Sequence, residues 1–189
     1  MKRVLVTALL LLVACKKAET PPPADTAPAP GSPAWKVASA RSAAPAEVSA
    51  NATVMDGSPF DSAAASQLAA GENGWRCYPD NPRTEGADPI CLDEPAMQWV
   101  AAFMARRPPR LTGMAIGYMM RGGVSASDTD PFKAAPDSGQ PWIQDPPAIG
   151  IAMPSARSYA GLPTHRRPDG PWIKFAGTPY AYIVIPSGP

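Results

Sequence analysis

Proline is the residue that most limits what this chain can fold into. The 189 residues include 26 prolines, spread along the sequence. Proline has no backbone N–H to donate and its φ angle is fixed, so helices end and central strands are interrupted where it occurs. We therefore expect short helices and strands that are joined by many loops.

The first 14 residues have the pattern of a signal peptide. Lys2 and Arg3 precede a nearly unbroken apolar run, Val4–Ala14, and a basic start before a short apolar stretch is typical of exported proteins. The run is too short for a transmembrane helix, which needs roughly 20 apolar residues. Residues 1–14 are therefore predicted to be removed on export.

The run ends in Leu12, Val13, Ala14 and Cys15. These residues resemble the lipobox of bacterial lipoproteins. The resemblance implies that the Cys15 sulfur is diacylated, that the chain is cleaved before Cys15, and that the new amine is acylated. Stable anchoring needs more than one acyl chain, because each buried methylene contributes only about 0.8 kcal/mol. The alternative is an ordinary cleaved signal with a chance cysteine.

Lipidation would hold the chain at the cell envelope through its N-terminal lipid anchor. Cys15 is followed by Lys16 rather than by Asp, and similarity to sorted lipoproteins then implies the outer membrane, facing the periplasm or the cell surface. Loss of Lys2 and Arg3 leaves 15 basic and 16 acidic side chains. This balance argues against a nucleic-acid partner.

Residues 15–46 are predicted to form a disordered, Pro/Ala-rich linker. Their only large apolar residues are Trp35 and Val37, so they bury too little surface to offset the entropy of ordering. The segment contains the prolines Pro21, Pro22, Pro23, Pro28, Pro30, Pro33 and Pro45. A coil of this length averages roughly 30 Å from end to end. The remaining residues, 47–189, are predicted to form one domain.

The clearest element of this domain is a helix over residues 95–107. Asp93 can cap it, and Pro108 ends it. Strands are predicted over 111–120 and 148–153, and a hairpin over 172–176 and 180–185. The fold class that we expect is α+β, with a small, mostly antiparallel sheet and one principal helix.

Two weaker patterns precede the helix. Val48–Val54 alternates in the manner of a strand. Ser62–Ala70 follows Asp61, a residue suited to helix capping, and favours a helix, although Gln67–Ala70 can also be read as a strand.

Two of the predicted strands have one face made of small residues. Ala115 and Gly117 share a face in the first, and Gly150 and Ala152 share a face in the second. A face of this kind lets another group approach closely. We expect the helix that carries Trp99 to lie there, and a ligand in the hollow is the alternative.

Cys77 and Cys91 are the other cysteines of the exported chain. An oxidising compartment favours a disulfide between them, and closing a loop of about 15 residues contributes roughly 3 kcal/mol in the chain-entropy model. A reactive or metal-binding pair is the alternative, without CxxC spacing or a nearby histidine to support it.

Three segments of the domain resemble a group of uncharacterised exported bacterial proteins. They are 74–80 (GWRCYPD), 88–93 (DPICLD) and 122–131 (GGVSASDTDP). The likeness covers roughly residue 50 to the C-terminus. It implies a domain of the same kind and gives no activity.

The loop over residues 121–131 is the main candidate for a ligand or metal site. It combines a glycine pair with oxygen-bearing side chains, in the residues Arg121, Gly122, Gly123, Ser125, Ser127, Asp128 and Asp130. Oxygen ligands suit Ca²⁺, so Asp128 and Asp130 form a possible calcium pair. The loop lacks the EF-hand glycine and glutamate, and an ordinary turn before Pro131 is the simpler interpretation. No other metal site and no catalytic residue is predicted.

Two functions follow from these features. The first is a non-enzymatic envelope module that binds a partner, such as an envelope protein or a glycan. The second is a small periplasmic hydrolase that uses Ser and Asp residues of the 121–131 loop, with calcium as an optional cofactor. A hydrolase predicts a concave pocket where this loop meets His165 or the Cys77–Cys91 loop, and an interaction module predicts a flat apolar patch.

Overall fold

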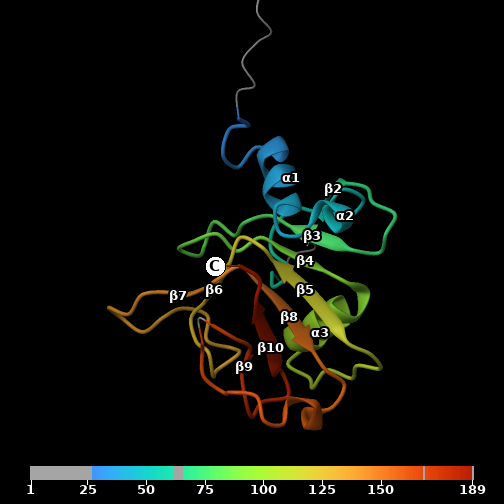
Figure 1. Cartoon of the computed structure of the whole chain (residues 1–189). Helices are drawn as coiled ribbons and strands as arrows, with labels where there is room; N and C mark the ends of the chain where they lie inside the picture. The colour runs from blue at the N-terminus through green and yellow to red at the C-terminus, as the bar shows by residue number, and fades with distance from the viewer. Residues whose placement is uncertain (1–26, 62–65, 168, 189) are drawn as a thin grey trace, which may run out of the picture.

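The computed structural model describes residues 27–61, 66–167 and 169–188. An eight-stranded sheet with the order β2-β1-β3-β4-β5-β8-β10-β9 dominates it (Figure 1). The strands are β1 (Thr53–Met55), β2 (Gln67–Ala69), β3 (Arg76–Tyr78), β4 (Ile90–Leu92), β5 (Ala115–Met119), β8 (Ala148–Ala152), β9 (Trp172–Lys174) and β10 (Tyr182–Pro186). Neighbouring strands are antiparallel apart from β1 and β3. The predicted α+β class with a mostly antiparallel sheet is confirmed, and the sheet is larger than expected.

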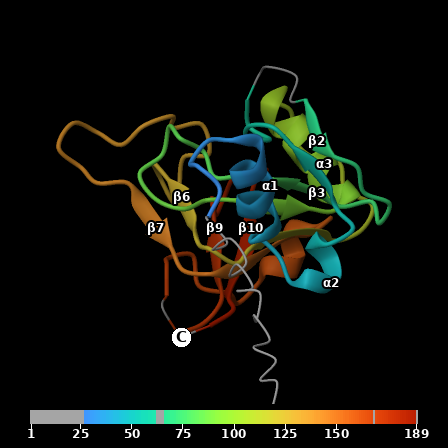
Figure 2. The same cartoon turned by 90° about the horizontal axis from the view of Figure 1, so that it is seen from above.

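The remaining elements lie around this sheet. Strands β6 (Gly123–Ser125) and β7 (Ile143–Asp145) form a separate antiparallel pair. Figure 2 shows this pair to one side of the molecule, with β2 and β3 on the other. The helical elements of the described ranges are α1 (Pro33–Arg41), α2 (Ala46–Ser49), α3 (Glu94–Met104) and the 3-10 turn η1 (Ala156–Tyr159). No helix in these ranges is both long and apolar enough to cross a membrane.

Helix α3 forms where the sequence predicts the principal helix. Its N-cap is Asp93, whose carboxylate accepts a hydrogen bond from the Ala96 N–H at 2.8 Å. The same carboxylate accepts from the Ile116 N–H on β5 at 3.0 Å. One side chain therefore ends the strand, starts the helix and ties the helix to the centre of the sheet.

Helix α1 corrects the predicted linker over residues 15–46. Ser32 caps the helix by accepting from the Trp35 N–H, and α1 packs against β1 and β3. Ala40 and Ala43 are fully buried, so the fold includes residues well before position 47. The prediction of disorder was wrong here because it weighed only large apolar residues, whereas alanines let a helix lie close to a sheet. Residues 15–26 lie outside the described residues.

The two patterns before α3 also differ from expectation. The alternation over Val48–Val54 is not one strand, because Ala46–Ser49 is helical and β1 begins at Thr53. In the second pattern, Gln67–Ala69 forms the strand β2 rather than a helix. Residues 62–65 lie outside the described residues.

The disulfide between Cys77 and Cys91 is confirmed. The two cysteines are directly opposite each other on β3 and β4, with 4.0 Å between their Cα atoms. Cys91 belongs to the core cluster under α1, while its neighbour Leu92 belongs to the cluster beside α3. Adjacent strand residues point to opposite faces, so α1 and α3 cover opposite faces of the sheet.

Candidate functional site

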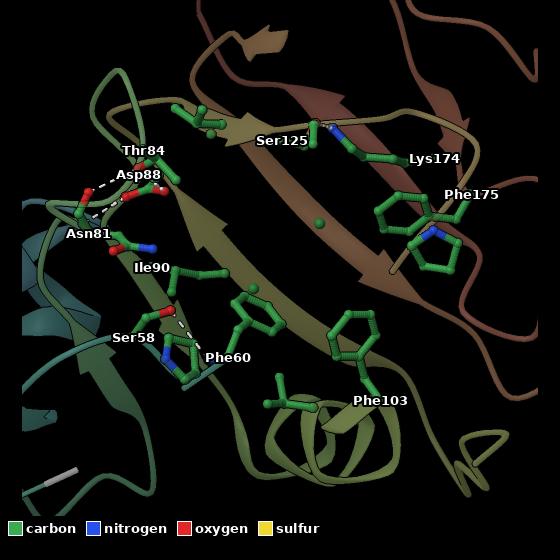
Figure 3. A pocket seen from close by; sticks show the side chains of 18 of the residues that line it. Ser58, Phe60, Asn81, Thr84, Asp88, Ile90, Phe103, Ser125, Lys174 and Phe175 are labelled. Atoms are coloured by element: carbon green, nitrogen blue, oxygen red, sulfur yellow. Dashed lines mark hydrogen bonds between the residues drawn. The ribbon is translucent and has the colours of Figure 1, made fainter. Parts of the chain in front are cut away.

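A pocket of about 790 Å³ lies over the face of the sheet that carries α3. Its size falls within the range of small-molecule sites, roughly 300–1,000 Å³. Two predicted loops contribute to its wall: residues of the 121–131 loop and residues of the Cys77–Cys91 loop both line it. Figure 3 shows Asn81, Thr84 and Asp88 together at the upper left and Ser125 beside Lys174 at the top, with Phe60 and Phe103 below.

The pocket exists because the two central strands carry small side chains on this face. Ala115 and Gly117 on β5 pair with Ala152 and Gly150 on β8, respectively, and all four line the pocket. The flanking strands carry larger groups on the same face, Leu92 on β4 and Tyr182 on β10. The result is a trough with a flat floor.

Helix α3 covers one side of this floor and the pocket occupies the rest. The expected packing of α3 on the small-residue face is therefore correct, and the hollow that was its alternative is present as well. Trp99 and Phe103 stack with an interplanar angle of 12° and a centroid distance of 5.5 Å. Phe132 extends the stack at 5.0 Å from Phe103. At 42% exposure, Phe60 stands at the edge of the pocket, with its ring edge-on to Phe103.

A buried charge cluster closes one side of the pocket. Lys174 is 1% exposed, and its Nζ contacts carboxylate oxygens of Asp145 and Asp128, the latter at 3.1 Å. Arg166 contacts the other oxygen of Asp145 at 2.6 Å. Two cations and two carboxylates leave the cluster without net charge. Such a cluster satisfies its own buried charges and attracts neither an anion nor a cation strongly.

Ser125 and Tyr182 carry hydroxyl groups and line the pocket together with Lys174 and Asp145 of this cluster. Lys174 Nζ donates to Ser125 Oγ at 2.8 Å. Tyr182 is opposite Lys174 in the β9–β10 register. Burial raises the pKa of the Tyr182 phenol, and the charges of Asp145 and Asp128 raise it further. The phenol therefore keeps its proton at neutral pH.

A second polar group lies in the Cys77–Cys91 loop. Asp88 accepts a hydrogen bond from the Asn81 N–H at 2.8 Å, and its other oxygen bonds the Thr84 hydroxyl at 2.8 Å. Burial raises the pKa of the Asp88 carboxyl to about 6 from 3.8, with a smaller rise from the nearby Asp80 carboxyl. These hydrogen bonds oppose the rise without cancelling it. Asp88 thus titrates close to the neutral range.

The structure places only some of the predicted 121–131 site residues in the pocket wall. Gly123, Ser125, Ser127 and Asp130 line the pocket. Asp128 is turned to its ion pairs with Lys174 and Arg166. Arg121 is exposed and Gly122 is buried in a turn, with a φ of 97° that suits glycine. Cys15 lies outside the described residues.

The two aspartates proposed for calcium do not share a site. Asp128 already pairs with two cations, and one oxygen of Asp130 accepts from the Phe132 N–H. Within residues 27–61, 66–167 and 169–188, no group of three or more His, Cys, Asp or Glu side chains is placed to hold a metal ion. His165 is exposed and is not among the residues that line the pocket.

Sequence reasoning missed the charged and phenolic residues of the site. The sequence contained one indication of this cluster, at Lys174. A lysine between Ile173 and Phe175 lies in an apolar strand, and burial of its charge requires polar partners. Its partners Asp145 and Asp128 are 29 and 46 residues away in the sequence. No local pattern connects them.

Comparison with protein-family models, with curated proteins and with solved structures gives no match to this chain. The likeness to uncharacterised exported proteins therefore stays a prediction.

Proposed function

We propose that the chain is an envelope lipoprotein whose domain binds a small apolar molecule in the pocket over β5 and β8. The observation that carries the proposal is the pocket itself, which combines a glycine and alanine floor with an aromatic wall. Apolar enclosure with a few placed polar groups is the usual composition of ligand sites. A flat patch for a protein partner, which the interaction hypothesis predicts, is not what lies at the junction of the two loops.

A pocket at this junction also favours the hydrolase hypothesis, so the two must be weighed by chemistry. Ser125 Oγ accepts a hydrogen bond from Lys174 Nζ at 2.8 Å, so this neighbour donates to the hydroxyl and does not act as a base that takes its proton. The Ser127 hydroxyl accepts from the N–H groups of Thr129 and Asp130. Neither serine has the adjacent base that activates a nucleophile. Binding without turnover is therefore the better proposal.

The proposal is tested with the full chain carrying Cys15→Ser, exported to the periplasm so that detergent is not needed. Titration with 1-aminoanthracene, a neutral apolar fluorophore, should give a saturable rise in emission. Gly150→Leu, which fills the floor from a position where an added Cβ meets only ordinary contacts at 3.5 Å, should abolish that rise. Ala160→Leu, at an exposed position, should leave it unchanged. Equal emission in all three proteins, or no emission in any, would refute the binding function.

The anchor is tested by comparing the chain that keeps Cys15 with the Cys15→Ser chain. The first, acylated at Cys15, should partition into the detergent phase of a Triton X-114 extract, and Cys15→Ser should move to the aqueous phase because it cannot be acylated. Retention of both forms in the detergent phase would show that something other than lipid holds the chain.

A further inference from the structure

The pocket carries two hydroxyl donors that the protein does not use. Lys174 has only protons to offer, so in its contact with Ser125 the serine oxygen is the acceptor and the Ser125 O–H is left over. Among the residues that the structure describes, neither the Ser125 O–H nor the Tyr182 O–H donates to another protein group. Both residues line the pocket.

The two hydroxyls lie at the same place in the fold. Ser125 is at hydrogen-bond distance from Lys174, and Tyr182 is opposite Lys174 across the β9–β10 pair, so the two side chains share a face of the sheet. Ser125, Lys174 and Tyr182 all line the pocket. When a ligand excludes water from the pocket, a hydroxyl that finds no acceptor on the ligand is left unpaired, which is costly.

The charge around these donors selects the kind of oxygen that suits them. Lys174 and Arg166 are matched by Asp145 and Asp128, so the cluster beside the two hydroxyls has no unbalanced positive charge to offset the desolvation of a carboxylate or phosphate there. Arg106, at the other wall, lies over the Phe132 ring. A neutral oxygen with two lone pairs can accept from both hydroxyls at once. A carbonyl group has this geometry.

The rest of the pocket selects the shape of the molecule. Gly117 and Gly150 add no side chain of their own to the floor, where the nearest side chains are those of Leu92, Met119 and Tyr182. The wall presents the stacked rings of Trp99 and Phe103. A flat ring system makes contact with both surfaces, since aromatic groups prefer stacked or edge-on neighbours at 4.5–7 Å. A flexible acyl chain would gain less from a flat floor and would lose more conformational entropy.

We propose that the ligand is a neutral, flat, ring-containing molecule with a carbonyl oxygen, held by the Ser125 and Tyr182 hydroxyls. This inference rests on the proposed function and names the chemical class that the pocket takes. The two hydroxyls are positioning groups for the carbonyl, and the rings of α3 and the glycine floor hold the apolar body.

The test is displacement of 1-aminoanthracene from the full chain carrying Cys15→Ser. Three competitors differ only in their polar group: 2-acetylnaphthalene, 2-ethylnaphthalene and 2-naphthoate. The ketone should displace the probe at about one-tenth of the concentration that the hydrocarbon needs, because the hydrocarbon leaves both donors unpaired. The carboxylate should be weaker than the ketone. Equal displacement by ketone and hydrocarbon, or strongest displacement by 2-naphthoate, would overturn the inference.

Variants of the two donors sharpen the test. Ser125→Ala and Tyr182→Phe should each reduce the tenfold preference for the ketone to about threefold, and the double variant should remove it. Displacement by 2-ethylnaphthalene should stay unchanged in all of them, which shows that the pocket is intact. A preference that survives the double variant would also overturn the inference.

Two matched variants serve as controls. Ser158→Ala removes an exposed hydroxyl and Tyr180→Phe removes a phenol, and neither residue is among those that line the pocket. Both should keep the tenfold preference. If 1-aminoanthracene itself does not bind, the proposed function fails and this inference falls with it. If the probe binds and the competitors are not distinguished, only the inference fails.

Discussion

Small side chains cover the central sheet on both of its faces, with opposite results. Under α1, Ala40 and Ala43 pack against Val54 and the disulfide, and all of these residues are fully buried. Beside α3, the glycines and alanines of β5 and β8 face an open pocket of about 790 Å³. On one face small residues let a helix approach closely, and on the other they leave room that the protein does not fill. The same composition therefore builds a solid core or a binding site, depending on what lies above it.

The largest effect on stability should come from the Cys77–Cys91 disulfide, which belongs to the closely packed face of the sheet under α1. Replacing the disulfide in the double variant Cys77→Ala/Cys91→Ala should lower the free energy of unfolding by about 3 kcal/mol, because it frees a loop of about 15 residues in the unfolded chain. Urea unfolding followed by tryptophan fluorescence measures this. A loss below about 1 kcal/mol would mean that the packing under α1 does not depend on the bridge.

The next effect tests whether α1 belongs to the folded domain. Ala40→Leu forces three extra carbon atoms into a site with no exposed surface, and overpacking of this kind costs about 2 kcal/mol. The same unfolding experiment measures it, with the exposed Ala160→Leu as control. If Ala40→Leu unfolds at the wild-type urea concentration, α1 is not packed against the sheet and the linker reaches further than the structure shows.

A smaller effect concerns the pH dependence of stability that Asp88 causes. This residue lies in the loop between β3 and β4. Asp88 has a pKa of about 6 in the folded chain, against 3.8 ordinarily. Between these values the folded state holds a proton that the unfolded state has lost, so stability falls as pH rises from about 4 to 6. After allowance for partial solvent screening, the fall attributable to Asp88 is about 1–2 kcal/mol.

Asp88→Asn should remove this fall from the curve of unfolding free energy against pH. The exposed Asp137→Asn should keep it. Loss of a hydrogen bond would shift the free energy of unfolding equally at every pH. Loss of the Asp88 titration instead changes the slope of the curve of unfolding free energy against pH. Parallel curves for wild type and Asp88→Asn would contradict the raised pKa.

The smallest effect on stability should be on the hollow face, meaning the face of β5 and β8 that lines the pocket. At Gly150, on the pocket floor, an added Cβ meets its nearest neighbours at an ordinary 3.5 Å. Gly150→Leu should therefore change the free energy of unfolding by less than about 1 kcal/mol although binding is lost. Gly150→Leu and Ala40→Leu thus compare the two faces by introducing the same side chain. Equal destabilisation would mean that the hollow face is packed as tightly as the other.

The sequence predicts individual helices, strands and caps better than the way in which they assemble. The cap at Asp93 and the small-residue faces of β5 and β8 follow from local patterns. The helix itself ends at Met104, three residues before the predicted end at 107. The pairing of β5 with β8 does not, because these strands are about 30 residues apart and only their contact turns two small faces into one floor. Long-range pairing is set by the tertiary fold rather than by periodicity.

The site shows the same limit. Loop residues such as Ser125 stand out by their turn composition, and the structure brings four of the seven predicted loop residues to the pocket wall. Lys174, Asp145 and Tyr182 belong to strands and contribute through burial, which no short motif records. The helix α1 was missed for a related reason, since alanine is counted as weakly apolar although it is an excellent helix former.

The most direct test of the central claim is an NMR titration of the full chain carrying Cys15→Ser with 1-aminoanthracene. The account predicts that amide signals of Gly117 and Gly150 and of residues along α3 shift in a saturable way, while those of Ala40 and Ala43 under α1 stay in place. Shifts confined to the α1 side, or no saturable shift on β5 and β8, would contradict the claim that the hollow face of the sheet is a binding site.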